Sequence, residues 1–114
     1  MDDPNQIEVP ASFVALYASP SGHRLLEPMD TVRRRYELCE DLAQMLIEQA
    51  STLQFKTGAP EEEVLATLLA GLAAPESTVQ PAEAGWVVRR LAELLEWRLP
   101  PMAELASITP HARK

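Results

Sequence analysis

Three consecutive arginines, Arg33, Arg34 and Arg35, are the side chains whose type and spacing most favour binding chemistry in this sequence. Guanidinium groups recognise carboxylates and phosphates through paired hydrogen bonds. The cluster therefore predicts a docking point for an anionic group on a partner molecule. The structural alternative pairs Arg33 with Glu37, one helical turn away, and leaves the other two arginines facing solvent.

A second group of candidate binding residues lies later in the chain and consists of Trp86, Arg89, Arg90 and Trp97. The two arginines could assist the first cluster in holding an anionic partner. The tryptophans are eleven residues apart, almost three helical turns, so a continuous helix would bring both indoles to one side. There they would either cover the N-terminal arm or form a ridge that binds a partner.

Nucleophilic catalysis has two conceivable centres, and neither is favoured. Cys39 is the single cysteine and falls within an apolar stripe, where a thiol packs as a small hydrophobe. Ser21 and His23 lie two residues apart in a stretch with Pro20 and Gly22, and no acidic residue is placed to orient the imidazole. We therefore expect no catalytic residues and no enzyme.

Nucleotide and metal sites are not expected either. A P-loop needs a glycine-rich turn that continues into Gly-Lys-Ser/Thr, whereas Lys56 follows Phe55 and Lys114 follows Arg113. The chain has two histidines, one cysteine and no Glu-x-x-His pair, so a zinc or di-iron ligand set is missing. We predict neither a cofactor nor a bound metal.

The composition is that of a soluble globular protein that avoids nucleic acid. Of the 114 residues, 46% are hydrophobic and 24% are charged, and the net charge is −7. An excess of carboxylates repels phosphates, so nucleic acid is not an expected partner. No apolar run approaches the roughly 20 residues that cross a bilayer, and the acidic start is unlike a signal peptide. We expect a cytoplasmic protein without membrane contact.

An apolar stripe predicts one long central helix over about residues 30–57. Its members recur at spacings of four and three: Val32, Tyr36, Cys39, Ala43, Leu46, Ala50 and Leu53. Four further residues widen this face, namely Leu38, Leu42, Met45 and Ile47. We expect Asp30 to cap the first turn through its side chain and Gly58 to end the helix in the left-handed conformation.

Two shorter helices are expected after this one. The first spans about residues 60–74. Its buried face is predicted to consist of Val64, Leu65, Leu68, Leu69 and Leu72. The second spans about residues 81–98, with Glu83 in its first turn, where the helix dipole favours a carboxylate. The double proline Pro100-Pro101 closes it.

The two ends of the chain are less regular. The arm over residues 1–19 contains a short amphipathic segment whose apolar residues include Phe13 and Tyr17, which are candidates for contact with the tryptophans or with a partner. The tail over residues 100–114 has only a weak helical pattern, so its order is not predicted. We expect one domain over residues 1–99, an all-α small three-helix bundle with an N-terminal amphipathic arm or short helix.

Three segments resemble a group of short proteobacterial proteins: DDPNQIEVPASF at 2–13, RYELCEDLA at 35–43 and AEAGWVVRRLAELL at 82–95. The likeness covers most of residues 1–97. Members of the group often carry the label "ATPase with chaperone activity". Because the chain has no P-loop, the resemblance implies an accessory to a chaperone ATPase rather than the motor itself.

These patterns together predict a non-enzymatic protein-interaction or adaptor module. Broad apolar faces on three helices and a separate amphipathic arm favour binding to a protein partner or to a second copy of the chain. Two alternatives remain open. One is nucleotide-dependent chaperone or ATPase activity, which the label implies, and the other is a DNA-binding regulator that uses the last two helices.

Overall fold

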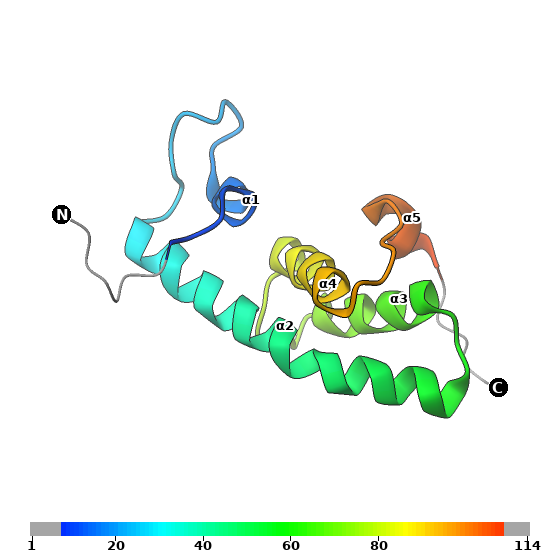
Figure 1. Ribbon diagram of the computed structural model, residues 1–114. Helices are drawn as coiled ribbons and strands as arrows, with labels where there is room; N and C mark the ends of the chain where they lie inside the picture. The colour runs from blue at the N-terminus through cyan, green and yellow to red at the C-terminus, as the bar shows by residue number, and fades with distance from the viewer. Residues whose placement is uncertain (1–7, 109–114) are drawn as a thin grey trace.

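The computed structural model describes residues 8–108, and this part of the chain folds into helices without a strand. The elements are α1 (Ala11–Val14), the 3-10 turn η1 (Ala15–Tyr17), α2 (Met29–Thr57), α3 (Glu61–Leu72), α4 (Pro81–Leu95) and α5 (Met102–Ser107). Figure 1 shows α2 as one long rod with the other helices on one side of it. The expected all-α bundle is confirmed.

The helix α2 is 29 residues long, which corresponds to about 44 Å at roughly 1.5 Å per residue. It ends as predicted, because Gly58 adopts φ 70° and its amide donates to the carbonyl of Gln54 at 2.8 Å. It begins at Met29, one residue before the predicted start, but the predicted cap by Asp30 is wrong. Pro28 precedes the first turn, no side chain caps it, and the Asp30 carboxylate accepts instead from Arg33 at 3.0 Å.

The predicted stripe is the buried side of α2, and α3 and α4 pack against it (Figure 1). Five of its seven members are buried, namely Val32, Cys39, Ala43, Leu46 and Ala50. Tyr36 and Leu53, the other two, are half-buried at its margins. Small residues dominate the stripe, so the neighbouring helices approach α2 closely with their larger leucines and valines.

The helix α4 ends three residues earlier than predicted. Glu96 adopts φ 59°, and the Trp97 amide donates to the Ala92 carbonyl at 2.9 Å, the hydrogen bond that commonly closes an α-helix. Trp97 therefore lies beyond α4, and the prediction that it shares one side of a helix with Trp86 is wrong. The α3 helix also stops early, at Leu72 rather than 74.

Of the N-terminal arm, residues 1–7 lie outside the described part of the chain, and residues 11–17 form the short amphipathic helix that the sequence predicts. Phe13 in α1 and Tyr17 in η1 are both buried in the core. An exposed loop follows, and two hydrogen bonds close it: the Ser19 amide donates to Arg24 and the Leu26 amide to Tyr17, each at 2.7 Å. The loop returns the chain to the start of α2.

The first part of the predicted tail is ordered and belongs to the core. The helix α5 lies against α3, and its Leu105 side chain has no exposed surface. Between α3, α4 and α5 lies an apolar groove of about 320 Å³, lined by four alanines and Gly85 together with Leu69, Pro81, Met102 and Ile108. Residues 109–114 of the tail lie outside the described part of the chain.

The packing of α5 predicts that Leu105→Ala lowers the free energy of unfolding by about 2–5 kcal/mol, because the substitution leaves a cavity in the core. Glu104→Ala, on the exposed side of the same helix, is the matched control and should change stability by less than about 0.5 kcal/mol. Urea unfolding followed by circular dichroism measures both. Equal, small effects of the two substitutions would contradict the packing.

Candidate functional site

A buried carboxylate, that of Glu83, lies at the centre of the polar contacts. Its Oε1 accepts from Arg35 Nη2 at 2.7 Å and from the Gln80 amide at 2.9 Å. Its Oε2 accepts from Arg35 Nε at 2.9 Å and from the Tyr17 hydroxyl. The side chain is 1% exposed, so four donors from η1, α2 and the start of α4 replace the water it loses.

This arrangement sets the protonation states of the groups involved. Burial alone would raise the pKa of Glu83, but the hydrogen bonds from Arg35 and Tyr17 outweigh it and hold that pKa below its ordinary value. Burial, together with the hydrogen bond to Glu83, raises the pKa of Tyr17 to about 12. The hydrogen bonds to Glu83 raise the pKa of Arg35. At neutral pH Glu83 and Arg35 are therefore both charged and form an ion pair, and the Tyr17 phenol that donates to Glu83 is neutral.

The three predicted arginines of α2 do not act together. Arg35 is occupied by Glu83 and also donates from Nη2 to the Thr78 carbonyl at 3.0 Å. Arg33 pairs with Asp30, so the expected pair with Glu37 is wrong. Arg34 is exposed and has no ion pair with the residues that the structure describes. Within the described residues, only Arg34 of the three is therefore without an ion pair, and the three side chains do not form one anion-binding site.

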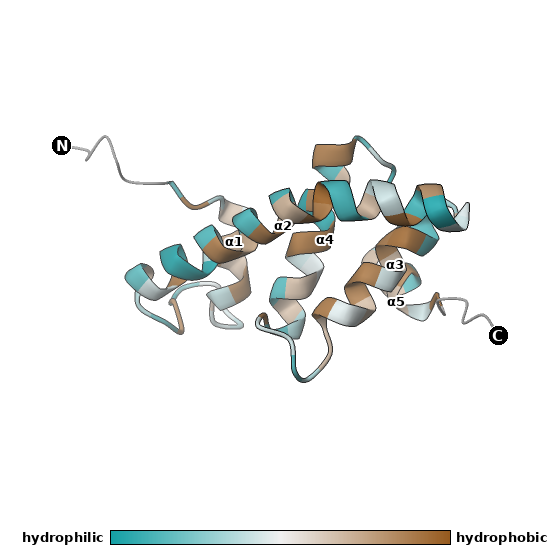
Figure 2. Cartoon of the chain, turned by 90° about the horizontal axis from the view of Figure 1, so that it is seen from below, coloured by the Kyte–Doolittle hydropathy of each residue, from teal (hydrophilic) through white to brown (hydrophobic). Residues whose placement is uncertain are grey.

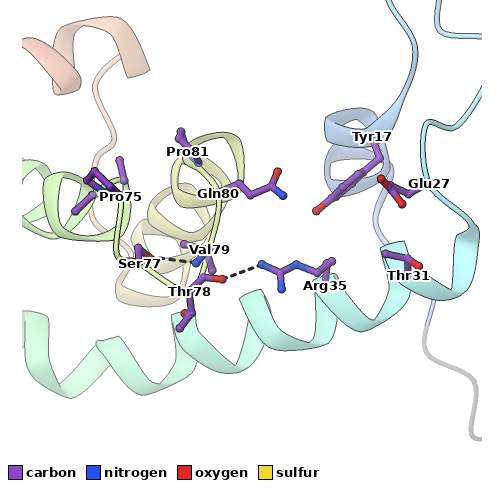
Figure 3. A pocket seen from close by; sticks show the side chains of 12 residues that line it. Tyr17, Glu27, Thr31, Arg35, Pro75, Ser77, Thr78, Val79, Gln80 and Pro81 are labelled. Atoms are coloured by element: carbon purple, nitrogen blue, oxygen red, sulfur yellow. Dashed lines mark hydrogen bonds between the residues drawn. The ribbon is translucent and has the colours of Figure 1, made fainter.

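A polar cleft of about 470 Å³ opens beside Arg35, between η1, α2 and the loop that joins α3 to α4. Figure 3 shows the Arg35 side chain crossing to Thr78, with Gln80 near it and with Tyr17, Glu27 and Thr31 on the opposite side. Because Glu83 already neutralises Arg35 and Glu27 adds a negative charge, the cleft is not suited to a phosphate or carboxylate.

The second predicted group divides between core and surface. The Trp86 ring packs edge-on against Phe13 and Tyr36, at centroid distances of 5.1 and 5.7 Å, and its Nε1 donates to Ser12 Oγ at 3.0 Å. The indole therefore covers the arm, which is one of the two expected arrangements. Phe13 is fully buried, so it is not accessible to a partner. Trp97 is half-buried against the core.

Two predicted arginines border a hollow of about 380 Å³ next to Trp86. Arg90 is occupied, since its Nε donates to Glu40 at 2.9 Å and its Nη1 to Glu93 at 3.1 Å. Arg89 is exposed and forms no ion pair within residues 8–108. The structure thus brings Trp86, Arg89 and Arg90 together at one hollow, with two carboxylates beside them, and none of the α2 arginines lines this hollow.

Sequence reasoning missed the central role of Glu83 and expected only a favourable interaction with the helix dipole. The signal was its place as the third residue of α4, after Gln80 and Pro81, where a glutamate reaches back to the amide that precedes the helix. Its pairing with Arg35, 48 residues earlier, has no local signal in the sequence.

The outer face of α2, opposite the core, carries the most exposed large apolar side chains of α2. We define this face by six residues: Glu37, Leu38, Asp41, Met45, Glu48 and Phe55. Leu38, Met45 and Phe55 are 39%, 71% and 90% exposed. Figure 2 looks at the chain from this side and shows hydrophobic bands alternating with hydrophilic ones along α2. Leu38 and Met45, which the sequence predicted to widen the apolar face of this helix, are thus left exposed by the elements of residues 8–108.

No protein-family model matches the chain, and comparisons with curated proteins and with solved structures find no match either. The resemblance to proteins labelled as chaperone ATPases therefore stays a prediction. Within residues 8–108, no helix is long and apolar enough to cross a membrane. In the same residues, no three His, Cys, Asp or Glu side chains gather where they could hold a metal ion.

The network around Glu83 predicts a pH-dependent effect of Glu83→Gln. At neutral pH the substitution should lower the free energy of unfolding by about 3 kcal/mol, because it leaves Arg35 without its buried partner. The lowered pKa means that the carboxylate stabilises the fold above its ordinary pKa of about 4.5 and loses this effect as the pH falls through the folded-state value. The difference between variant and wild type should therefore shrink below about pH 4.5.

Urea unfolding between pH 3 and 7 measures this difference. Glu93→Gln is the control, because it removes an exposed carboxylate that also pairs with an arginine, and it should cost less than about 1 kcal/mol at every pH. A Glu83→Gln effect that stays constant over the whole range would show that the network does not depend on the ionised carboxylate.

Burial also governs Cys39, which has no exposed surface. Burial and the nearby Glu83 carboxylate raise the pKa of its thiol to about 12. We expect a disulfide reagent at pH 8 to react with the native protein at least about 100-fold more slowly than with the urea-unfolded chain. Absorbance of the released thiolate follows the reaction, and rapid labelling of the native protein would contradict a packing role.

Proposed function

We propose that this chain is a non-enzymatic protein-interaction module of the cytoplasm, an adaptor that binds a protein partner along the outer face of α2. The observation that carries the proposal is the exposure of Leu38, Met45 and Phe55 on the outside of one continuous helix. Single apolar residues on a surface are ordinary, whereas several large ones along one helix are typical of an interface.

The architecture supports this proposal because it makes α2 a rigid, accessible rod. The helices α3 and α4, of 12 and 15 residues, cover only its inner side and are together shorter than its 29 residues. An amphipathic helix that presents a second apolar row away from its own core can bind another helix by the same side-chain packing that builds the bundle.

The chemistry of the remaining candidates favours binding over catalysis. Cys39 is buried and protonated at neutral pH, and Arg35 and Arg90 are held by carboxylates. Ser21 and His23 are both exposed in the loop, and their hydrogen bond runs from the His23 backbone amide to Ser21 Oγ at 3.4 Å rather than to the imidazole. No arrangement of nucleophile, base and orienting acid is formed by these groups.

The identity of the partner is part of the same proposal. The resemblance to proteins labelled as chaperone ATPases makes such an ATPase the partner to look for first. DNA is disfavoured, because the face we propose carries three carboxylates and the arginines nearest to it are mostly paired.

The proposal predicts that Met45→Glu abolishes partner binding without unfolding the protein. Met45 is 71% exposed, so a carboxylate is tolerated there in the monomer but would be desolvated in an apolar interface. Ala103→Glu, on the exposed side of α5, adds the same charge elsewhere and is the control. Affinity purification with each protein as bait, followed by quantitative mass spectrometry, measures the partners retained.

We expect at least one protein to bind the wild type and the Ala103→Glu control and to decrease more than tenfold with Met45→Glu. Circular dichroism should show the same helix content and melting temperature within a few degrees for all three baits. If Met45→Glu and Ala103→Glu recover the same proteins in the same amounts, the outer face of α2 is not the binding surface.

A further inference from the structure

Two rows of side chains run next to each other along the outer side of α2. Residues four and seven apart lie above one another on a helix, so positions 38, 42 and 45 form one row and positions 37, 41, 44 and 48 the next. In the first row Leu38 and Met45 are exposed apolar side chains, whereas Leu42 between them is half-buried and packs against the core. The second row consists of Glu37, Asp41, Gln44 and Glu48 and continues, seven residues after Glu48, to Phe55.

Within residues 8–108, the carboxylates of the second row have no positively charged partner. Glu37, Asp41 and Glu48 form no ion pair with any residue of the described range 8–108. By contrast, Glu40, which lies on the same helix but outside this row, forms an ion pair with Arg90 of α4. These three like charges, about one to three turns apart, repel each other, and a cation from outside would relieve that repulsion.

We propose that the partner contributes a basic amphipathic helix, whose apolar side chains pack on Leu38, Met45 and Phe55 and whose Lys or Arg side chains pair with the carboxylates of the second row. This inference rests on the proposed function and names the chemistry of the partner. From Leu38 to Phe55 the face extends about 26 Å at roughly 1.5 Å per residue, so a helix of about 17 residues covers it.

A second copy of this chain suits the face less well. Two copies of α2 packed antiparallel about Met45 would leave the acidic rows without cations, because Arg34 of one copy would lie opposite Lys56 of the other. Parallel packing would set each of Asp41 and Glu48 beside its own counterpart. In both arrangements like charges meet, which destabilises the contact.

Two synthetic helical peptides of 18 residues test the inference on the full chain. They carry the same leucine stripe and differ only in their flanking residues, which are lysines in one and glutamates in the other. Fluorescence anisotropy with a labelled peptide gives each dissociation constant at two salt concentrations. We expect the lysine peptide to bind at least tenfold more tightly than the glutamate peptide and to lose affinity as salt rises.

Charge reversal on the protein gives the decisive comparison. The double substitution Asp41→Lys with Glu48→Lys should weaken binding of the lysine peptide at least tenfold and strengthen binding of the glutamate peptide. The double substitution Glu61→Lys with Glu62→Lys, in the first turn of α3, changes the net charge equally and is the control. Met45→Glu should weaken both peptides, because it interrupts the apolar row.

Several outcomes would overturn the inference. Equal affinity for the two peptides, or no binding of either, would exclude recognition of a basic helix. If the α3 control loses as much affinity for the lysine peptide, the effect comes from net charge and not from the outer face of α2. A dimer in sedimentation that Met45→Glu dissociates would identify a second copy as the occupant. These results are independent of the purification test of the proposed function. If that test finds a partner that is lost with Met45→Glu but has no basic helix, the proposed function stands and this inference is wrong.

Discussion

The ion pair between Glu83 and Arg35 is the constraint on which the rest of the structure depends. A carboxylate that is almost fully buried must have all of its hydrogen bonds satisfied, and here the donors come from three separate parts of the chain. The contact therefore fixes where α4 crosses α2 and where the N-terminal arm lies. Tyr17 brings the arm to Glu83, and Phe13, four residues earlier, is thereby set against Trp86.

The helices were predictable because their determinants are local. The alternating spacing of Val32, Cys39, Ala43 and the other stripe residues repeats the helical period, and Gly58 ends α2 as its conformational freedom allows. The end of α4 was not predictable in the same way, since Glu96 adopts a left-handed conformation that is usual for glycine and rare for a residue with a side chain. The order of the tail was not predicted for a similar reason, because α5 is held by tertiary contacts of Leu105, Met102 and Ile108 with the core that have no local signal in the sequence.

The candidate site shows that residues adjacent in the sequence need not share a role in the structure. Arg33, Arg34 and Arg35 look like one cluster in the sequence, but successive residues on a helix point about 100° apart. One of them reaches the core and one pairs locally, so their common charge does not give a common role. The partner of Arg35 is 48 residues away, and only the tertiary structure brings it close. Candidate residues that are adjacent in sequence were thus mostly structural.

The same geometry explains why Leu38 and Met45, which the sequence predicted to widen the apolar face of α2, are exposed. Leu38 and Met45 extend the apolar width of α2 beyond what two short helices can cover, because α3 and α4 have already filled the inner side with the stripe residues. Several large apolar side chains beyond the buried face of one helix are typical of a surface that binds another molecule. The ion pairs of Arg35 with Glu83 and of Glu40 with Arg90 join α2 to α4, so α2 is held in place while Leu38 and Met45 stay exposed.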